Sequence, residues 1–472
     1  MIRGLAAPVR ATLAHASSGV LLALATCGLA EAGLASVARP VYAAAALLLG
    51  IRLERRDAAR YVSFVFWLWF LSPLVRRVAD LQGGWQEPSL VLLAPYLASA
   101  AAVPPVLHRW LVADADTRRR PGALVIFLAA AAGVALGVPT GAWHGLSTAA
   151  LETLNWLLPV VFGLYIATRT PDLHRIEAAV ARTFGAAALV SAAYGVYQFT
   201  RPPLWDIHWM QRIAMTTIGR PEPFAVRVFG TMHSPGVYSA FLVVALVLWL
   251  GRPRVAGMCA AGVAVVALLL SQVRSSWFAL AVGALLVVAS LGARQRLRVG
   301  LLATVVVAGA SAALVTDEMR QLVSGRVSTM ERLEDDESAV ARLIGHRLAF
   351  EFLAEHPWGA GIGQSDRRME EYISMRDSLV ASTVVQFGLL GTALYTAGVA
   401  GMTWLLWSYY RRAASVQGAA FGAAGLGLLA AAGLSVVTAG PIGMCVWTFT
   451  GLAVVDRQQR RLRSAATSGE VT

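Results

Sequence analysis

Long apolar segments recur along the whole chain, and they limit its fold more than any other feature. Window after window holds roughly 17 to 25 apolar residues without a charge, about the length of helix that crosses the ~30 Å hydrocarbon core of a bilayer. These segments are uniformly rich in Ala and Leu rather than alternating in polarity, so we expect helices instead of barrel strands. With 57% hydrophobic and 14% charged residues in 472, the chain is too apolar for soluble domains. The sequence predicts an all-α polytopic membrane protein.

The candidate transmembrane helices number 12 to 14. The count depends on the second candidate, which is short and could pair with the first as a broken hairpin. Assigned by apolar length, the candidates are 18–37, 40–51, 60–75, 89–107, 122–138, 148–168, 176–199, 234–250, 255–271, 276–292, 299–316, 379–408, 416–438 and 441–456.

Arginine sets the expected orientation, because it supplies all 40 basic residues of a chain with a net charge of +13. When the candidate helices alternate in direction, the arginine clusters of the short loops fall on one side. The positive-inside rule assigns that side, and both termini, to the cytoplasm. Topology therefore explains much of the basic charge better than nucleic-acid binding does. The clusters are Arg52 to Arg60, Arg118 to Arg120, Arg169 with Arg175, Arg252 with Arg254, Arg294 to Arg298, Arg411 with Arg412, and Arg457 to Arg463.

Three loops on the opposite face carry arginine against this rule. Orientation does not explain these charges, so we expect a functional role for them. Arg76, Arg77 and Asp80 follow the third candidate helix, and two longer loops cover 200–234 and 317–378. The last loop has apolar residues near helical spacing. This pattern favours amphipathic helices that lie on the membrane surface.

The sequence favours a site without a metal or cofactor. The three cysteines fall inside apolar segments and show no CxxC spacing, and no HxxxH or HExxH pattern occurs. GAGIG at 359–363 follows no predicted strand, so we interpret it as a turn of close approach rather than a dinucleotide loop.

Three outward-facing stretches occur in an order that is typical of one protein family. RVFGTMHSPGVYSAFL covers Arg227–Leu242, SQVRSSWFALAVG covers Ser271–Gly283, and the late loop runs through HPWGAGIGQSD towards DSLVASTVVQFGLLG. This order resembles the O-antigen ligase and polymerase superfamily. That family has an Arg-Gly stretch before one helix, an arginine-serine turn, and a large late periplasmic loop. The loop ends in a Pro-Gly-x-Gly segment and a His-Asn or Asp-Asn pair. The resemblance covers about Tyr194–Gly398.

The resemblance implies a membrane glycosyltransferase of the bacterial inner membrane. Its members transfer a glycan from an undecaprenyl-diphosphate carrier at the periplasmic face, by an inverting and metal-independent route. The implied partners are the undecaprenyl-diphosphate-linked oligosaccharide, membrane lipids, and a chain-length regulator or other polysaccharide assembly proteins, without nucleic acid. Residues 200–400 would then form the catalytic region. Membrane helices in 1–199 would precede it, and helices with a cytoplasmic tail in 401–472 would follow it.

Arginines carry the implied diphosphate site. Arg274 matches the turn arginine of the family, Arg227 the arginine of the Arg-Gly stretch, and Arg342 that of the long loop. Fixed guanidinium groups suit the negative charge of a diphosphate leaving group. Each position also has a plainer interpretation. Arg274 could anchor a helix end, Arg227 could pair with Glu222, and Arg342 could lie on a solvated face beside acidic residues.

Further candidates for substrate binding surround these three positions. Trp205 could stack on a sugar face or belong to an interfacial aromatic belt, and a lone histidine before Ser-Pro is also compatible with a turn. The remaining candidates would add positive charge to the diphosphate site. The full set is Arg347, Arg220, Arg376, His233 and Trp205.

Asp377 stands where the family carries its His-Asn or Asp-Asn pair, and Ser378 follows it. Ligases typically have histidine there, whereas an acidic residue is closer to the polymerase branch. The departure therefore favours polymerisation over ligation to lipid A. Asp377 could act as the base for the acceptor hydroxyl, or it could cap the helix that starts near Leu379. The two roles are compatible.

The leading hypothesis is a glycan polymerase that moves the growing chain from its lipid diphosphate onto a new lipid-linked repeat unit. An O-antigen-type ligase, acting on lipid A core or protein, differs only in its acceptor. A secondary transporter would need charged residues near mid-span, which the candidate helices almost lack. A transferase that uses a lipid monophosphate sugar would use an acidic residue such as Asp80 or Glu87. The leading hypothesis requires the arginines at 227, 274 and 342 to converge on one outward-facing cavity.

Overall fold

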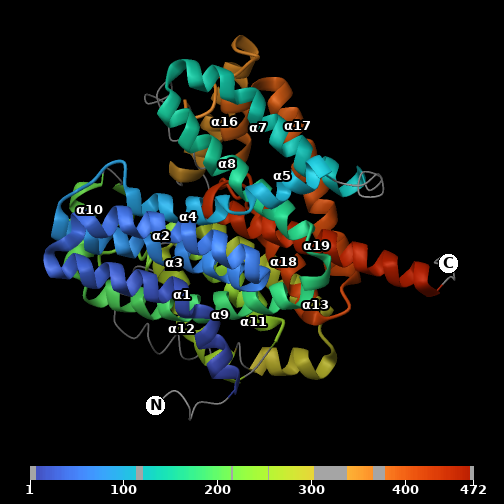
Figure 1. Ribbon diagram of the computed structural model, residues 1–472, viewed down its shortest axis with the longest axis horizontal. Coiled ribbons are helices and arrows are strands. Elements are labelled where there is room, and N and C mark those ends of the chain that lie inside the picture. The colour runs from blue at the N-terminus through green and yellow to red at the C-terminus, as the bar shows by residue number, and fades with distance from the viewer. Residues whose placement is uncertain are drawn as a thin grey trace. The chain divides into compact units, whose positions relative to one another are not determined.

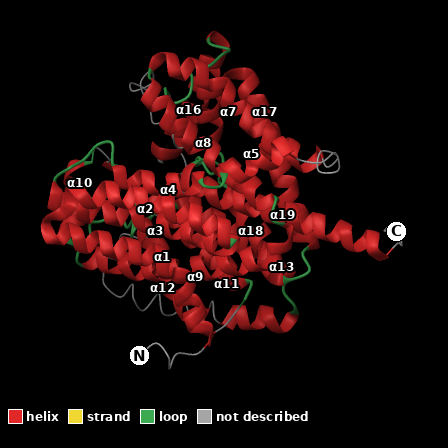
Figure 2. Cartoon of the chain, viewed as in Figure 1, coloured by secondary structure: helices red, strands yellow, loops and turns green. Residues whose placement is uncertain are grey.

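The computed structural model describes residues 7–112, 121–213, 216–252, 255–301, 304, 337–364 and 378–467. Within these ranges helices are joined by turns, and strand pairing is limited to a single bridge between Gly219 and Val226 (Figure 2). The all-α fold predicted from the apolar segments is confirmed.

Among the described residues, seven helical segments are long and apolar enough to cross a membrane. They are Ser18–Arg56, Ala58–Gly83, Leu90–Arg109, Ala123–His144, Leu146–Ala167, Leu173–Thr200 and Leu379–Arg412. Shorter apolar helices cover Pro235–Leu250, Cys259–Ser271, Arg274–Ser290 and Val416–Ala430. The chain is therefore a multi-pass membrane protein, as predicted. The candidate helix 299–316 lies almost wholly outside the described residues.

The chain divides into two compact units that are interleaved along the sequence. The first takes Met1–Ala102, Pro171–Trp277 and Leu291–Val315, and the second takes Val103–Thr170, Phe278–Ser290 and Thr316–Thr472. The three-part division by function expected from the sequence stays a prediction.

The first unit contains six helices that position the site, after an opening hairpin. They are α3 (Ala58–Gly83), α4 (Leu90–Ala100), α9 (Leu173–Thr200), α10 (Leu204–Arg212), α11 (Pro235–Leu250) and α12 (Val255–Ser271). Short 3-10 segments, η3 (Thr170–Asp172) and η4 (Thr216–Ile218), lie between them in the chain.

A helical hairpin opens this unit. The short π-helical segment η2 (Ala30–Leu34) separates α1 (Ala7–Leu29) from α2 (Ala35–Arg56), and within it Gly33 has a φ of +81°. Glycine reaches positive φ at little cost, so the helix breaks there, and α1 and α2 contact each other (Figure 1). The expected broken hairpin is present, and its second arm is longer than predicted.

Helix α3 forms the core of the first unit and packs against α1, α2, α4 and α9. Asp57 caps its N-terminus by accepting from the N–H groups of Ala59 and Arg60. The helix continues two turns beyond the predicted end at 75, so Arg76, Arg77 and Asp80 lie inside it and are buried. The expectation that they follow the helix in a loop was wrong. The apolar window ended at the first charge, whereas the helix did not.

The second unit is built on two closely packed helix pairs. It contains α5 (Val103–Val112), α7 (Pro121–His144), α8 (Leu146–Ala167), α16 (Glu337–Glu355), α17 (Leu379–Arg412), α18 (Val416–Ala430) and α19 (Gly440–Thr467), and α13 (Arg274–Ser290) begins in the first unit and continues here. Helix α7 packs on α17 and α8 on α19 (Figure 1). Gly133 lies against the backbone of Gly391, and Gly163 against the backbone of Trp447. Small residues at such crossings let membrane helices approach closely.

Helix α16 belongs to the late loop, where amphipathic helices were expected on the membrane surface. Its Ala349 is buried against the first turns of α17, where it meets Ala381, Val384 and Val385. Half-buried side chains of α16 complete this contact: Leu348, Phe352 and Leu353. The helix is confirmed, and the face that carries Ala349 packs on α17.

The glycine-rich segment after α16 joins two membrane helices of the second unit. Ala360 N donates to Val385 O (2.7 Å) of α17, and Ile362 N donates to Gly137 O (2.9 Å) of α7. Helix α17 is interrupted at Gly388, whose φ is +68°, and Leu389 N donates across this break to Pro357 O (2.8 Å). The GAGIG segment is thus a turn of close approach, as its glycines indicated.

Replacing Gly361 with alanine should destabilise the second unit strongly. Its φ of +92° disfavours any side chain, and a Cβ there would overlap the backbone of Thr140 and Gly141. Strain of this kind costs about 1–3 kcal/mol before the overlap is counted. Thermal unfolding in detergent measures the effect. Gly345→Ala, in open space on α16, is the matched control and should stabilise by about 1 kcal/mol. Equal melting temperatures for the two variants would contradict this assignment of the turn.

Candidate functional site

Arg274 is the first residue of α13, directly after the turn that ends α12. In this turn Gln272 has a φ of +55°, a left-handed conformation that is uncommon for residues other than glycine. The described part of the chain therefore places Arg274 at a constrained turn, at the start of a helix, as the sequence predicted.

Arg227 holds this same turn from a neighbouring segment. Its Nε donates to Ser271 O (2.7 Å) and its Nη2 donates to Gln272 O (3.0 Å). A third bond runs from Nη1 to Thr217 O (3.2 Å). The guanidinium thus lies at the C-terminal end of α12, where unpaired helix carbonyls favour a cation. The structure brings Arg227 close to the turn of Arg274, which lies 47 residues away in sequence.

Arg220 lies near Arg227 in the chain and is exposed. Its Nε is 3.9 Å from a carboxylate oxygen of Glu222, and both side chains are largely in solvent. Glu222 had been the alternative partner for Arg227, and the ion pair that the structure describes for it is with Arg220. An exposed pair at this distance contributes little to stability.

A buried ion pair joins α3 to α10 in the first unit. Arg77 and Asp206 approach to 3.0 Å, and the exposed fractions of their side chains are 1% and 0%. Burial raises the pKa of the Asp206 carboxyl, whereas the Arg77 guanidinium and hydrogen bonds from Gln198 and Tyr194 favour its charged form. The guanidinium also lies 4.8 Å from the centre of the Phe229 ring.

A second charged cluster occupies the same end of α3. Asp80 is 3.0 Å from Arg39 and 3.1 Å from Arg76. Arg39 also donates to the carbonyls of Ala79 (2.7 Å) and Gly84 (2.6 Å), which are among the last of the helix. These charged residues lie just outside the candidate helices 18–37, 40–51 and 60–75, but inside the longer helices α2 and α3 that the structure describes. Charged residues inside a membrane helix usually face a partner, so Arg76, Arg77 and Asp80 next to an apolar segment could have indicated buried ion pairs.

His233 lies between the Arg-Gly stretch and α11. Burial, with Arg77 and Arg76 nearby, lowers its pKa to about 4. Its Nδ1 is buried and has no hydrogen-bond partner within the described ranges. At neutral pH the imidazole is therefore uncharged, which does not favour a cationic role toward a diphosphate.

The pKa of His233 predicts an acid-sensitive fold. Because the folded pKa of about 4 lies below the ordinary value of 6.5, the unfolded chain binds more protons between these values. Stability should therefore fall as pH drops from 6.5 toward 4, by roughly 3 kcal/mol from this residue. Unfolding of the parent and His233→Gln at several pH values separates this contribution from that of the carboxylates. Parallel pH profiles for the two proteins would contradict it.

Trp205 is a half-buried residue of α10. Its Nε1 donates to the hydroxyl of Tyr194 (2.7 Å), and the ring packs beside a small buried cluster that contains Val78 and Ala79. These contacts fix one edge of the indole. Stacking of the ring on a sugar stays a prediction.

The remaining candidates belong to the second unit or lie outside the described residues. Arg342 is on α16, and its side chain is outside the described part. Arg347 is exposed and pairs with Glu351 (2.8 Å), so it lies on a solvated helix face. Arg376 and Asp377 lie outside the described residues. Because Arg227 and Arg274 belong to the first unit, their convergence with Arg342 stays a prediction.

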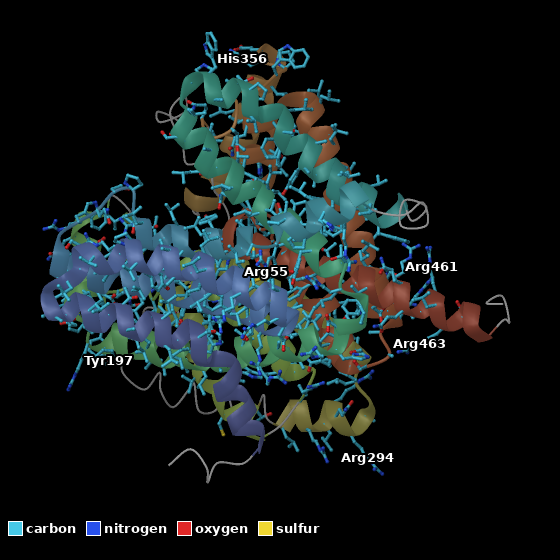
Figure 3. All side chains as sticks on the ribbon, in the orientation of Figure 1. Arg55, Tyr197, Arg294, His356, Arg461 and Arg463 are labelled. Atoms are coloured by element: carbon cyan, nitrogen blue, oxygen red, sulfur yellow. The ribbon has the colours of Figure 1, made fainter. Side chains whose placement is uncertain are left out.

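His346, an external histidine at helical spacing from Arg342, lies on α16 and reaches the start of α17. The Nε2 of His346 is 2.6 Å from the Oγ of Ser378, the residue that follows Asp377. Ser378 also caps α17 by accepting from Ala381 N (3.4 Å). His356, by contrast, is exposed (Figure 3), and its ring stacks on that of Phe352 of α16 with the ring centres 4.4 Å apart. The contact between His346 and Ser378 joins residues 32 positions apart, so local patterns could not have found it.

The described residues contain no group of three or more His, Cys, Asp and Glu side chains arranged to hold a metal ion.

Comparison with known families gives one match. Residues 259–396 match the family model described as O-Antigen ligase. The matched region contains the α12–α13 turn, α16, the glycine-rich segment and the kink of α17, while the Arg-Gly stretch precedes it. A search of curated proteins found no match. The family match supports the resemblance that the order of the three stretches had indicated.

Proposed function

We propose that this chain, whose residues 259–396 carry the domain of the O-antigen ligase and polymerase superfamily, is a glycan polymerase. It would transfer a polysaccharide chain from undecaprenyl diphosphate onto a lipid-linked repeat unit. The reaction would take place at the periplasmic face of the bacterial inner membrane, with both termini in the cytoplasm. The observation that carries this proposal is the position of Arg274, inside the matched region, at a turn that Arg227 holds by hydrogen bonds.

The proposed reaction is a single displacement at the anomeric carbon. The acceptor oxygen forms a bond to that carbon as the bond to the carrier phosphate breaks, and the configuration inverts. The hydroxyl proton passes to Asp377, and the carrier leaves as the diphosphate. Negative charge develops on the leaving oxygen, and the Arg274 guanidinium stabilises it by charge-assisted hydrogen bonds.

The choice of polymerase over ligase rests on Asp377, because the ligases of this family typically carry histidine at that position. An acceptor on lipid A core or on protein is the alternative, and it would use the same donor chemistry. A transferase that relies on Asp80 as its base is disfavoured. Both oxygens of that carboxylate contact arginine within 3.1 Å, and the side chain is 2% exposed.

Deletion of the gene, followed by electrophoresis of the surface carbohydrate, tests the proposal. A polymerase deletion should leave glycans of a single repeat unit, and complementation should restore the ladder of long chains. Long chains that accumulate on the carrier without attachment would identify a ligase instead. An unchanged carbohydrate profile would contradict both.

Asp377→Asn should lower the rate of polymerisation by about 10²-fold or more. Asparagine has nearly the same size as aspartate but cannot take up the proton of the acceptor hydroxyl as a carboxylate does. Chain length on gels and the rate of repeat-unit incorporation by purified protein would measure the loss. The structure assigns the cap of α17 to Ser378, so retention of the parental rate would leave Asp377 without the proposed role as base.

A further inference from the structure

The buried ion pair of the first unit is joined to the segment that carries Arg227. Arg77 donates to Met232 O from Nη1 (2.8 Å) and to Gly230 O from Nη2 (2.7 Å). On the same segment, the side-chain oxygen of Gln198 accepts from Phe229 N (3.1 Å) and Gly230 N (3.0 Å). The backbone of 229–232 is therefore fixed through both its carbonyls and its amides.

Asp206 fixes the residues that make these bonds. Its carboxylate lies 3.0 Å from Arg77 and accepts from the Tyr194 hydroxyl (2.8 Å) and from the Gln198 Nε2. Because Gln198 gives its N–H to Asp206, its oxygen must face the segment. Asp206 and Gln198 are both fully buried. Water therefore cannot take over these bonds, and loss of the carboxylate charge would disturb the whole set.

The same segment reaches the α12–α13 turn. Val228 N donates to Leu270 O (3.2 Å), and Arg227 donates to the carbonyls of Ser271 and Gln272. Gln272 is in the left-handed region, which persists where surrounding contacts impose it. Two residues later α13 begins with Arg274. A continuous series of hydrogen bonds thus runs from Asp206 to the backbone that carries Arg274.

We propose that Asp206, Arg77 and Gln198 are positioning residues for glycan transfer. They act through the Arg227–Met232 segment and the α12–α13 turn to hold Arg274 in place. This inference rests on the proposed function of Arg274. Placement of a charged group matters because a displacement of about 1 Å in an active site can cost roughly 10²-fold in rate. Arg227 serves the same end, since three of its N–H groups are directed at backbone carbonyls.

Asp206→Asn is the test, because it keeps the shape of the side chain and removes its charge. Asp57→Asn is the matched control. Asp57 also pairs with an arginine, Arg175, at 2.8 Å, and it caps the opposite end of α3. The purified full-length protein in lipid nanodiscs would be assayed for kcat and KM with lipid-linked repeat units. Amide hydrogen exchange would be followed in peptides that cover residues 268–278.

We expect Asp206→Asn to lower kcat at least tenfold, with KM changed less, and to speed exchange at 271–277 at least fivefold. Asp57→Asn should leave both measurements within twofold of the parent, even if its melting temperature falls as much as that of Asp206→Asn. Unchanged exchange at 271–277 in Asp206→Asn would overturn the proposal, and so would an equal loss of kcat in the control.

If Asp206→Asn does not fold, Tyr194→Phe replaces it, because that change removes one hydrogen bond to the carboxylate. It also removes the acceptor of Trp205 Nε1, so Trp205→Phe, which removes only that second bond, is measured beside it. For Tyr194→Phe we expect a threefold loss of kcat and a twofold faster exchange at 271–277, and unchanged exchange would again overturn the proposal. The proposed function and this inference can be refuted by different results. Arg274→Ala that retains the parental rate would refute the role of Arg274, whereas the exchange measurement tests the connection to the turn independently of activity.

Discussion

Arg274→Ala should eliminate long-chain glycan and lower the rate of transfer by about 10²–10³-fold, the usual cost of removing one group that stabilises charge in a transition state. The reason is the diphosphate leaving group, whose charge would lose its guanidinium partner. Arg274→Lys should recover little, because an ammonium cannot reproduce the planar fork of arginine. Chain length on gels, at matched protein levels in the membrane, is the first measurement.

The control for this prediction is Arg294→Ala. Arg294 follows the other end of α13 and its side chain points into solvent (Figure 3), so its removal should leave the glycan ladder unchanged. Arg227→Ala should also abolish long chains, since it releases the turn that carries Arg274. Parental chain length in the Arg227→Ala, Arg274→Ala double variant would refute both the role of Arg274 toward the diphosphate and the role of Arg227 in holding its turn.

Arg77→Met should destabilise the first unit by about 3–5 kcal/mol, because it leaves the Asp206 carboxylate buried without its cation. The variant also loses the hydrogen bonds to Gly230 and Met232. Thermal unfolding in detergent, followed by near-ultraviolet circular dichroism, would measure the loss.

Two further variants test whether the unpaired buried charge causes this loss of stability. Arg77→Met combined with Asp206→Leu removes both charges and should regain part of the lost stability, since apolar replacement of a whole buried pair is often tolerated. Arg347→Ala, which removes an exposed ion pair with Glu351, should change stability by less than about 1 kcal/mol. A loss in Arg77→Met no larger than that in Arg347→Ala would show that the buried pair contributes nothing.

The fold class could be predicted from the sequence because the bilayer imposes a length and a polarity on each crossing helix. The ends of helices were harder to predict. Helix α3 continues past the apolar window because Arg39 and Arg76 neutralise Asp80 within the fold. The spacing of Arg76 and Asp80 is a local helical pattern, whereas Arg39 lies 41 residues from Asp80 and no local pattern records it.

The candidate site was predicted in part. The turn of Arg274 followed from two apolar segments with a short polar break, and the structure places it there. The interaction of Arg227 with that turn, and of His346 with Ser378, depends on contacts between distant residues. Resemblance to a family could indicate which arginines matter. It could not indicate that Arg227 is directed at backbone carbonyls, because that depends on how α12 ends.

The break in α17 at Gly388 has a mechanical consequence. Pro357 follows α16 and is bonded across this break to Leu389, while the residues after it are bonded to α7 and α17. A displacement of α16 along its axis would therefore act directly on the first third of α17, at the break, rather than on a loose connecting loop.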